Sequence, residues 1–351
     1  GVQTERAEEA RQEDLLGEAM MSRAEHLLIE NSIVPSEGQI FAEGSEVVET
    51  IKSKLENYVH LNPRPVATER EVVSLLGLNA SIRPFRVPEV EDPYSYVANL
   101  VEVLKSTMHV DDFSASILKK VLYTLVASHK EPTIELVREM VEEEATYLTA
   151  TEYMSVRRLE SILADMTVGT FGSAMKEERL ELQGRVLVAI PDEFPVMFRY
   201  VPLAVVLLRL IHMKVDTPII ISDVEGYVPS RSNVLREERA VMFERISYFV
   251  RLFDILSRRR SMVLLQSMSS TLVASEVLMN SRNIILRRPR TDQELRTFEG
   301  FGIQWERLAP TDAIMLSPAS NLFAKRLRIQ QVRLEEIKVT REIPVQYYCV
   351  K

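Results

Sequence analysis

The chain has 351 residues, a length that suits one large domain or two modest ones. Its hydrophobic share of 46% and charged share of 27% are typical of globular proteins and exclude a disordered, collagen-like or fibrous chain. The net charge of −8 excludes a global electrostatic attraction to nucleic acid but not a local basic patch. The single cysteine, Cys349, excludes an internal disulfide framework and a cysteine-based zinc site, and it fits a reducing compartment.

Membrane insertion and secretion are not expected from this sequence. The most apolar run, residues 201–211, is far shorter than the ~20 residues that a membrane-spanning helix needs. The first 21 residues are charged and polar, unlike a signal peptide. We therefore expect a cytoplasmic protein whose association with a membrane, if any, passes through a partner protein.

Residues 1–95 are expected to form an N-terminal helix and a first βα unit. Residues 1–25 have the apolar spacing of a charged amphipathic helix. The short apolar run 26–29 predicts a strand, the turn-prone stretch after it a loop, and residues 41–59 a helix. Five prolines between residues 60 and 95 indicate irregular chain around one short predicted helix over residues 69–78.

Residues 96–183 are expected to form a helical subdomain. This stretch has little glycine and is rich in leucine, valine, glutamate and lysine. The periodicity predicts helices over residues 96–105, 111–128, 133–148, 155–165 and 173–180. Pro132 and Thr133, with Glu135 shortly after them, are a helix-start signal.

Residues 184–320 are expected to form an α/β core, and residues 321–351 a C-terminal strand or arm. Short continuous apolar runs predict strands over residues 185–190, 219–222, 262–267, 283–288 and 312–317. Helices are predicted between them, over residues 201–213, 237–257 and 275–280. Because the strands show no polar alternation, we expect a mainly parallel sheet that is covered on both faces.

Four segments of this core carry motifs of functional interest. They are IIISDVEGYVP (219–229), RRRSMVLLQSMSS (258–270), VLMNSRNIILRRPRTDQEL (277–295) and LAPTDAIMLSP (308–318). Their order and spacing over about 135 residues resemble the HerA/FtsK-type hexameric DNA-translocating ATPases, which include the conjugation ATPases. The resemblance implies a RecA-like P-loop core with a helical insert, a hexameric ring with DNA in its central pore, and ATP with Mg²⁺ between subunits.

The resemblance also implies roles for particular residues. Asp223 falls on the catalytic acidic position with Glu225 close by, and Gln266 falls on a glutamine that would sense the γ-phosphate. Basic residues would reach across to a neighbouring subunit or touch DNA: Arg258, Arg259, Arg260 and Arg287. Simpler interpretations stay open for all of these residues. The two acids can be solvent-facing side chains at a strand end, and Gln266 can be a buried amide that satisfies the backbone of a loop. The arginines can form a solvated helix end, where the helix dipole favours positive charge.

The phosphate-binding motif of the family is missing. GxxxxGK[ST], whose lysine contacts phosphates and whose hydroxyl binds Mg²⁺, occurs nowhere in the sequence. The best alignment places Gly38 on the last glycine, Gln39 on the lysine and Ile40 on the Ser/Thr, with Glu37 adding negative charge. Ser222 stands where a magnesium-holding acid is expected, so no metal ligand is assigned.

Three hypotheses follow. The chain is a ring ATPase that moves DNA; or it is a degenerate ATPase-like subunit, structural or regulatory, in a DNA-transfer or DNA-processing complex; or it is an unrelated α/β protein. A nuclease or a membrane channel is a further candidate partner. Two explanations of the missing motif stay open. Either the phosphate-binding loop has degenerated, or a stretch of sequence is absent near residues 30–80. A phosphate-cradling loop within residues 26–59 would favour the motor, and an ordinary turn would favour the structural subunit.

Overall fold

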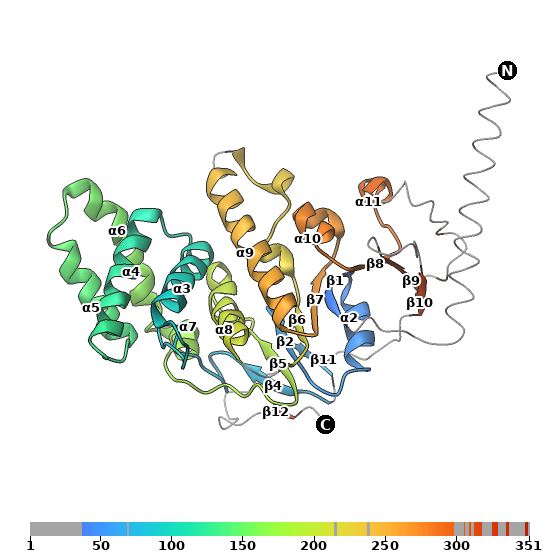
Figure 1. Ribbon diagram of the computed structural model, residues 1–351, viewed down its shortest axis with the longest axis horizontal. Coiled ribbons are helices and arrows are strands. Elements are labelled where there is room, and N and C mark those ends of the chain that lie inside the picture. Colours follow the sequence, from blue (N-terminus) through green and yellow to red (C-terminus); the bar gives the residue numbers. More distant parts are fainter. Residues whose placement is uncertain are drawn as a thin grey trace, which may run out of the picture. The chain divides into compact units, whose positions relative to one another are not determined.

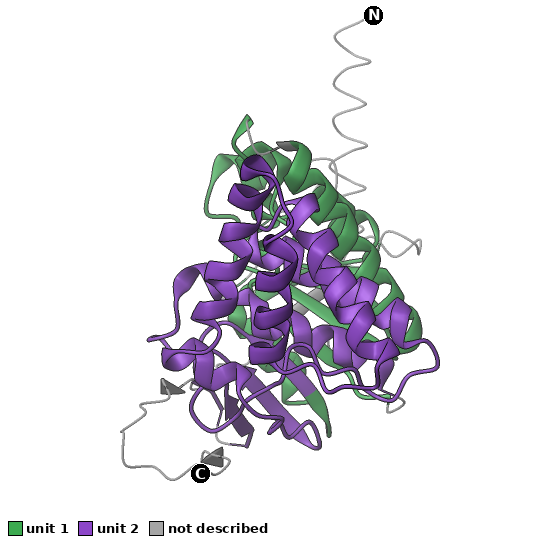
Figure 2. Cartoon of the chain, turned by 90° about the vertical axis from the view of Figure 1, so that its left-hand side faces the viewer, with its two compact units in different colours: residues 1–58, 216–333 green, residues 59–215, 334–351 purple. Residues whose placement is uncertain are grey.

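The computed structural model describes residues 37–68, 70–213, 216–236, 239–297, 305, 309 and 312–317, and the backbone of three short strands beyond them. The chain divides into two compact units, each made of two stretches of sequence (Figure 2). The first unit comprises residues 1–58 and 216–333, and the second comprises residues 59–215 and 334–351. The helix predicted over residues 1–25 and the strand predicted over 26–29 lie outside the described residues.

The first unit contains a mainly parallel sheet. Its strands run in the order β10-β9-β8-β1-β7-β6. β8, β1, β7 and β6 are parallel, whereas β9 pairs antiparallel with β8 and β10 antiparallel with β9. The bounds are β1 Gly38–Glu43, β6 Ile219–Ile221, β7 Met262–Ser267, β8 Asn283–Arg287, β9 Asp312–Leu316 and β10 Lys325–Arg328.

The first unit also contains helices and short 3-10 turns. They are α2 Ser45–Lys52, α9 Arg239–Arg259, α10 Ser275–Met279 and α11 Asp292–Thr297, with 3-10 turns η2 Val224–Gly226, η3 Arg231–Asn233 and η5 Ser270–Leu272. All six residues of β7 are buried, as expected for a strand with helices or loops on both sides. One cluster of buried side chains joins α2 to the central strands, through Val48, Ile51, Ile40, Leu264 and Ile285.

The second unit combines a smaller sheet with most of the helices. Its strands run in the order β2-β5-β4-β12, and β3 pairs with β11 separately. The strand bounds are β2 Tyr58–Asn62, β3 Val66–Ala67, β4 Val72–Leu75, β5 Arg185–Ala189, β11 Glu335–Glu336 and β12 Tyr348–Cys349. The helices are α3 Pro93–Met108, α4 Asp112–Ala127, α5 Ile134–Ala145, α6 Ala150–Asp165, α7 Gly169–Met175, η1 Val196–Phe198 and α8 Tyr200–His212.

The helices predicted over residues 96–165 are confirmed as α3 to α6, shown in Figure 1 in teal and green. The helix predicted over residues 173–180 overlaps α7 only at residues 173–175, because α7 ends at Met175. The starts of α3 to α6 are set by side-chain caps, which satisfy the free amides of a first helical turn. Asp92, Asp111 and Thr133 each accept a hydrogen bond from a backbone amide of the helix that follows. At α6, Thr149 and Glu152 form a reciprocal capping box.

The unit boundaries differ from the predicted domain boundaries. The predicted divisions after residues 95 and 183 both fall inside the second unit. The physical reason is strand pairing, because β4 and β5 lie parallel in the register Val72↔Val186 to Leu75↔Ala189. α3 to α7 are therefore an insertion within one βαβ crossover.

Two secondary-structure predictions are wrong. The helix predicted over residues 41–59 is the end of β1, the helix α2 and the start of β2, because Gly44 interrupts the helical pattern at a φ of 89°. The helix predicted over residues 69–78 contains β4, whose run VVSL pairs with β5. The strand β2 therefore follows α2 directly.

The predicted α/β class, with a mainly parallel sheet, is confirmed. The later strands match their predicted positions closely, β7 over the same six residues. Among the described residues, no helix is long and apolar enough to cross a membrane.

Candidate functional site

The parallel strands of the first unit bring several polar residues to one edge of the sheet. β1 and β7 pair in the register Ala42↔Gln266 and Glu43↔Ser267, and β6 pairs with β7 as Ile221↔Leu265. The residues that end these strands are therefore neighbours. In open α/β sheets, ligands bind outside the carboxyl ends of the strands, so this edge is the candidate site.

Asp223 and Gln266, both predicted catalytic residues, meet at this edge. The backbone amide of Asp223 donates to the side-chain oxygen of Gln266 at 3.1 Å, and both residues are buried. Asp223 has a φ of 52° and a ψ of 47°, a left-handed conformation that is uncommon outside glycine. Glu225 follows in η2 and is partly buried. The roles of all three in catalysis stay predictions.

The segment after Asp223 is fixed to its surroundings by buried contacts. Tyr227 is fully buried, and its ring packs edge-on against Phe249 and Phe253 of α9. The guanidinium of Arg245, also on α9, donates to the carbonyl of Gly226. The buried ring of Tyr227 therefore has a packing role here.

The connection between β1 and α2 is a tight turn. β1 ends at Glu43 and α2 begins at Ser45, so Gly44 alone separates them. The amide of Gly44 donates to the carbonyl of Ser267 at 2.9 Å, which ties the turn to the end of β7. A phosphate-cradling loop needs several successive amides that face a ligand, and a one-residue connection does not provide them.

Glu43 lies at the end of β1, where the loop of a P-loop protein would begin. Its side chain is 3% exposed and accepts a hydrogen bond from the amide of Ser270 at 2.6 Å. Burial raises the pKa of Glu43 to about 7, although the Ser270 amide and the nearby Arg287 lower it in part. A partly ionised carboxyl at this position would repel a phosphate.

The residues of this edge do not fit ATP with Mg²⁺. No lysine follows the turn until Lys52, at the far end of α2, and its ammonium group pairs with Glu49 at 3.2 Å. Among the described residues, no group of three histidine, cysteine or acidic side chains is placed to hold a metal ion. We therefore assign no chemical step to a bound nucleotide.

Arg287 is held within its own chain. It ends β8 and forms two hydrogen bonds to the carbonyl of Met268, at 2.7 and 3.0 Å, and two to the carboxylate of Glu294, at 3.0 and 3.1 Å. Only 13% of its side chain is exposed. Burial raises the pKa of Glu294, but hydrogen bonds from the Arg290 amide and Arg287 bring it below its ordinary value. These contacts argue against a role for Arg287 in a neighbouring subunit.

The residues predicted to bind the cofactor lie at the amino end of β1, opposite to the carboxyl ends of the strands that form the candidate site. Gly38, Gln39 and Ile40 begin β1, so the loop predicted there is wrong. The side-chain amide of Gln39 donates to the carbonyl of Val277 at 3.1 Å and to the hydroxyl of Ser281 at 3.2 Å. They do not meet Asp223 and Gln266, because they occupy the first positions of a strand whose last residue is Glu43.

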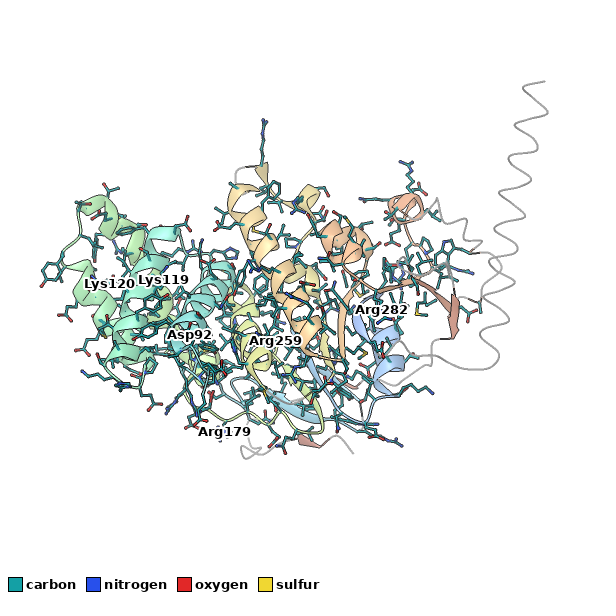
Figure 3. The ribbon with its side chains drawn as sticks, in the orientation of Figure 1. Asp92, Lys119, Lys120, Arg179, Arg259 and Arg282 are labelled. Atoms are coloured by element: carbon teal, nitrogen blue, oxygen red, sulfur yellow. The ribbon has the colours of Figure 1, made fainter. Side chains whose placement is uncertain are left out.

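The arginine cluster also lies at the amino end of the strands. Arg258 and Arg259 end α9, and β7 begins at Met262, four residues before Gln266. Arg258 pairs with Asp254 at 3.3 Å in an exposed contact, whereas Arg260 is 5% exposed and burial lowers its pKa. Figure 3 labels Arg259 at the end of α9. Within one chain, therefore, these arginines are not part of the candidate site.

Sequence reasoning missed Glu43, Gly44 and Glu294. The search for a phosphate loop was aimed at residues 31–40, after an expected strand at 26–29. A signal was present in FAEGSEVVETI, where one glycine separates an apolar run from an amphipathic helix. The pairing of Glu294 with Arg287 becomes evident only once the strand β8 and the helix α11 are placed.

Comparisons with known proteins agree with this fold. The structure of VirB4 of Thermoanaerobacter pseudethanolicus is 11% identical in sequence, with a TM-score of 0.60, and covers 84% of this chain and 90% of its own. The genome-packaging NTPase B204 of Sulfolobus turreted icosahedral virus 2, in complex with ATP-gammaS, is 8% identical. It covers 84% of this chain and 99% of its own, but its TM-score of 0.38 is too low to support an argument. No protein-family model and no curated protein matches the chain.

The chain therefore has the RecA-like P-loop ATPase fold. The structural likeness to VirB4 agrees with the fold that the sequence resemblance implies. At 11% identity this likeness defines the fold.

Proposed function

We propose that this chain is an ATPase-like subunit that does not hydrolyse ATP and that acts as a structural or regulatory partner in a DNA-transfer or DNA-processing complex. The observation that carries the proposal is the one-residue connection at Gly44, which replaces a phosphate-cradling loop. An ordinary turn at this place is the outcome that favours a structural subunit over a motor.

The chemistry around the turn supports the same proposal. A P-loop lysine and hydroxyl each make charge-assisted contacts with phosphate or its metal ion, worth roughly 1.5–3 kcal/mol apiece in binding. Here the lysine has no counterpart, and the buried carboxyl of Glu43 lies beside the turn. The loss of the lysine contact and the gain of a repulsive carboxyl together oppose nucleotide binding.

The fold supports the placement in a DNA-handling complex. VirB4 is a conjugation ATPase, and the chain follows its fold over 84% of its own length. Self-association into a ring, contact with DNA, and a nuclease or membrane-channel partner are parts of this proposal.

A second candidate is the DNA-translocating motor itself. It is favoured by one observation, the contact between Asp223 and Gln266 at the carboxyl edge of the sheet, where the family resemblance expects a catalytic acid and a sensor glutamine. In a ring, Arg258 and Arg259 could contact a neighbouring subunit. The motor requires nucleotide binding, which separates it from the first candidate.

Calorimetry with ATP and Mg²⁺ tests the two candidates on the full chain. We expect no binding heat up to millimolar ATP and no ATP turnover above background. The variant Glu43→Gln, which removes the negative charge beside the turn, is the matched control and is also expected not to bind. Micromolar ATP binding, with turnover that Asp223→Asn abolishes, would establish the motor and overturn the proposal.

A further inference from the structure

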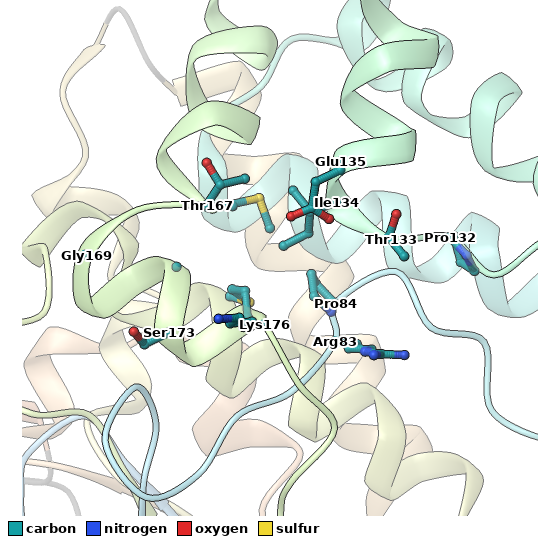
Figure 4. Close-up of a pocket in the computed structure, with 13 residues that line it drawn as sticks. Arg83, Pro84, Pro132, Thr133, Ile134, Glu135, Thr167, Gly169, Ser173 and Lys176 are labelled. Carbon is teal, nitrogen blue, oxygen red and sulfur yellow. The ribbon is translucent and has the colours of Figure 1, made fainter.

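A cavity of about 390 Å³ lies in the second unit, lined by the segment at Arg83, the start of α5, the end of α6 and the helix α7 (Figure 4). Buried side chains contribute its apolar lining: Ile134, Met166 and Met175. Polar residues also line it, including Thr133, Glu135, Thr167, Ser173 and Lys176. Its volume is in the range of ligand-binding pockets, and its apolar lining suits a single hydrophobic side chain.

An acidic stripe on α5 continues from this cavity. Glu135, Glu139 and Glu143 recur every four residues, so they lie along one face of the helix, and all three are exposed. Val137 and Val141 are fully buried on the other side. Because Glu135 also lines the cavity, the cavity and this α5 stripe form one continuous surface.

The α5 stripe is not neutralised within the described part of the chain. Arg138 pairs with Glu142 and Lys120 with Glu144, but none of the three stripe carboxylates has an ion pair among the described residues. Residues 133–165 carry eight acidic and three basic side chains, a net charge of −5, whereas the whole chain has −8. The negative charge is therefore concentrated on this helical hairpin.

We propose that the cavity and the α5 stripe bind a basic segment of a partner protein, with one apolar side chain in the cavity and lysine or arginine side chains along the stripe. Successive stripe residues are about 6 Å apart along the helix axis, close to the roughly 6.6 Å between alternate residues of an extended peptide. The negative charge opposes DNA at this surface. Val168, 62% exposed, adds apolar area beside the cavity residues Thr167 and Gly169.

This inference goes beyond the proposed function, since it depends on neither nucleotide nor ring formation. The cations near the cavity are compatible with it. Arg83 pairs with Glu131, and Lys176 can donate to a backbone carbonyl of the bound peptide. Attraction between a basic peptide and this surface is expected to weaken with salt.

The probe is a fluorescent peptide of one leucine followed by three lysines at alternate positions, with serines between them. We expect it to bind the full-length chain with a Kd on the order of 100 µM at low salt, as measured by fluorescence anisotropy. A peptide with serine in place of the leucine should bind at least about fivefold more weakly. No binding of the leucine peptide at 1 mM would overturn the proposal.

Variants of the chain locate the binding. Glu139→Gln with Glu143→Gln should weaken binding about fivefold, and Ser173→Trp should do so by filling the cavity. The control Glu89→Gln with Glu91→Gln makes the same charge change at another exposed place of the same unit and should leave binding unchanged. If the control weakens binding as much as the stripe variant does, or if the serine peptide binds as well as the leucine peptide, the proposal is wrong. Should Ser173→Trp fail to fold, the serine peptide still tests the cavity.

Discussion

At the scale of the residue, one buried carboxyl occupies the carboxyl end of β1. Glu43 ends β1 with 3% of its surface exposed, and burial raises its pKa to about 7. The amide of Ser270 and the guanidinium of Arg287 stabilise its charged form in part, and the charge of Glu294 acts in the opposite direction. The position normally used for phosphate therefore holds a titratable group of the protein itself.

The substitution Glu43→Gln should remove a pH dependence of stability. The folded pKa of about 7 lies above the ordinary value of 4.5, so between these values the native state binds more protons than the unfolded state. The stability of the wild type relative to the variant therefore falls as pH rises through this window, by about 3 kcal/mol in total. Urea unfolding of both proteins between pH 5 and pH 8 measures the difference.

A control for this pH effect is available nearby, at the start of α2. Glu46 is an exposed acid in the first turn of α2, and Glu46→Gln makes the same chemical change in solvent. A pH dependence of the same size in both variants would show that burial of Glu43 is not its cause.

Arg287→Ala should destabilise the first unit strongly. The substitution leaves the carboxylate of Glu294 and the carbonyl of Met268 without the partner that they have in the native chain. Loss of one member of a buried ion pair costs about 3 kcal/mol or more. The matched control is Arg282→Ala, whose pair with Glu37 is exposed and worth at most about 1 kcal/mol. Equal losses in a denaturant series would contradict the assigned role of Arg287.

At the scale of the element, the turn between β1 and α2 decides what the sheet edge can bind. Gly44 has a φ of 89° and a ψ of 149°, a region open almost solely to glycine. It allows the chain to leave a buried strand and start a helix within one residue. The amphipathic pattern of α2 was visible in the sequence, but its start was not, because a helical period and a strand end overlap in FAEGSEVV.

Gly44→Ala should destabilise the protein by about 1–3 kcal/mol, since alanine is strained in this conformation. A Cβ there would also approach the carboxylate of Glu46 to 3.1 Å. The control is Gly169→Ala, where φ is 63° and no atom lies within 4 Å of the added Cβ. We expect a cost nearer 1 kcal/mol for the control. Thermal melts of both variants give the comparison, and a smaller loss for Gly44→Ala would contradict it.

At the scale of the whole molecule, the net charge of the chain and the placement of its arginines bear on DNA binding. The net charge is −8, and the arginines that could contact DNA are divided among ion pairs, buried positions and exposed ones. A structural subunit with these properties would reach DNA through other members of its complex.

The isolated chain should therefore bind duplex DNA weakly. We expect no saturable binding below about 10 µM protein at physiological salt, because affinity for DNA comes largely from neutralised phosphates. Fluorescence anisotropy with a labelled 30-base-pair duplex tests this expectation. Sub-micromolar binding that Arg258→Gln with Arg259→Gln reduces would instead support the motor.

The sequence by itself determined the fold class and most elements of the α/β core. Unbroken apolar runs such as MVLLQS indicate strands of a sheet that is covered on both faces, and capped amphipathic segments such as the one that starts at Thr133 specify helices locally. The same local rules assigned residues 69–78 to a helix, since only the partner strand β5 shows that VVSL is a strand.

The tertiary structure alone decided the candidate site. Asp223 and Gln266 are 43 positions apart and meet because β6 and β7 are parallel neighbours. Glu43 becomes a buried, titratable carboxyl only when β1 is placed beside β7 and the Ser270 amide faces it. Contacts between residues far apart in the chain set burial and hydrogen bonding, and burial and hydrogen bonding determine whether a side chain can bind phosphate or instead occupies its place.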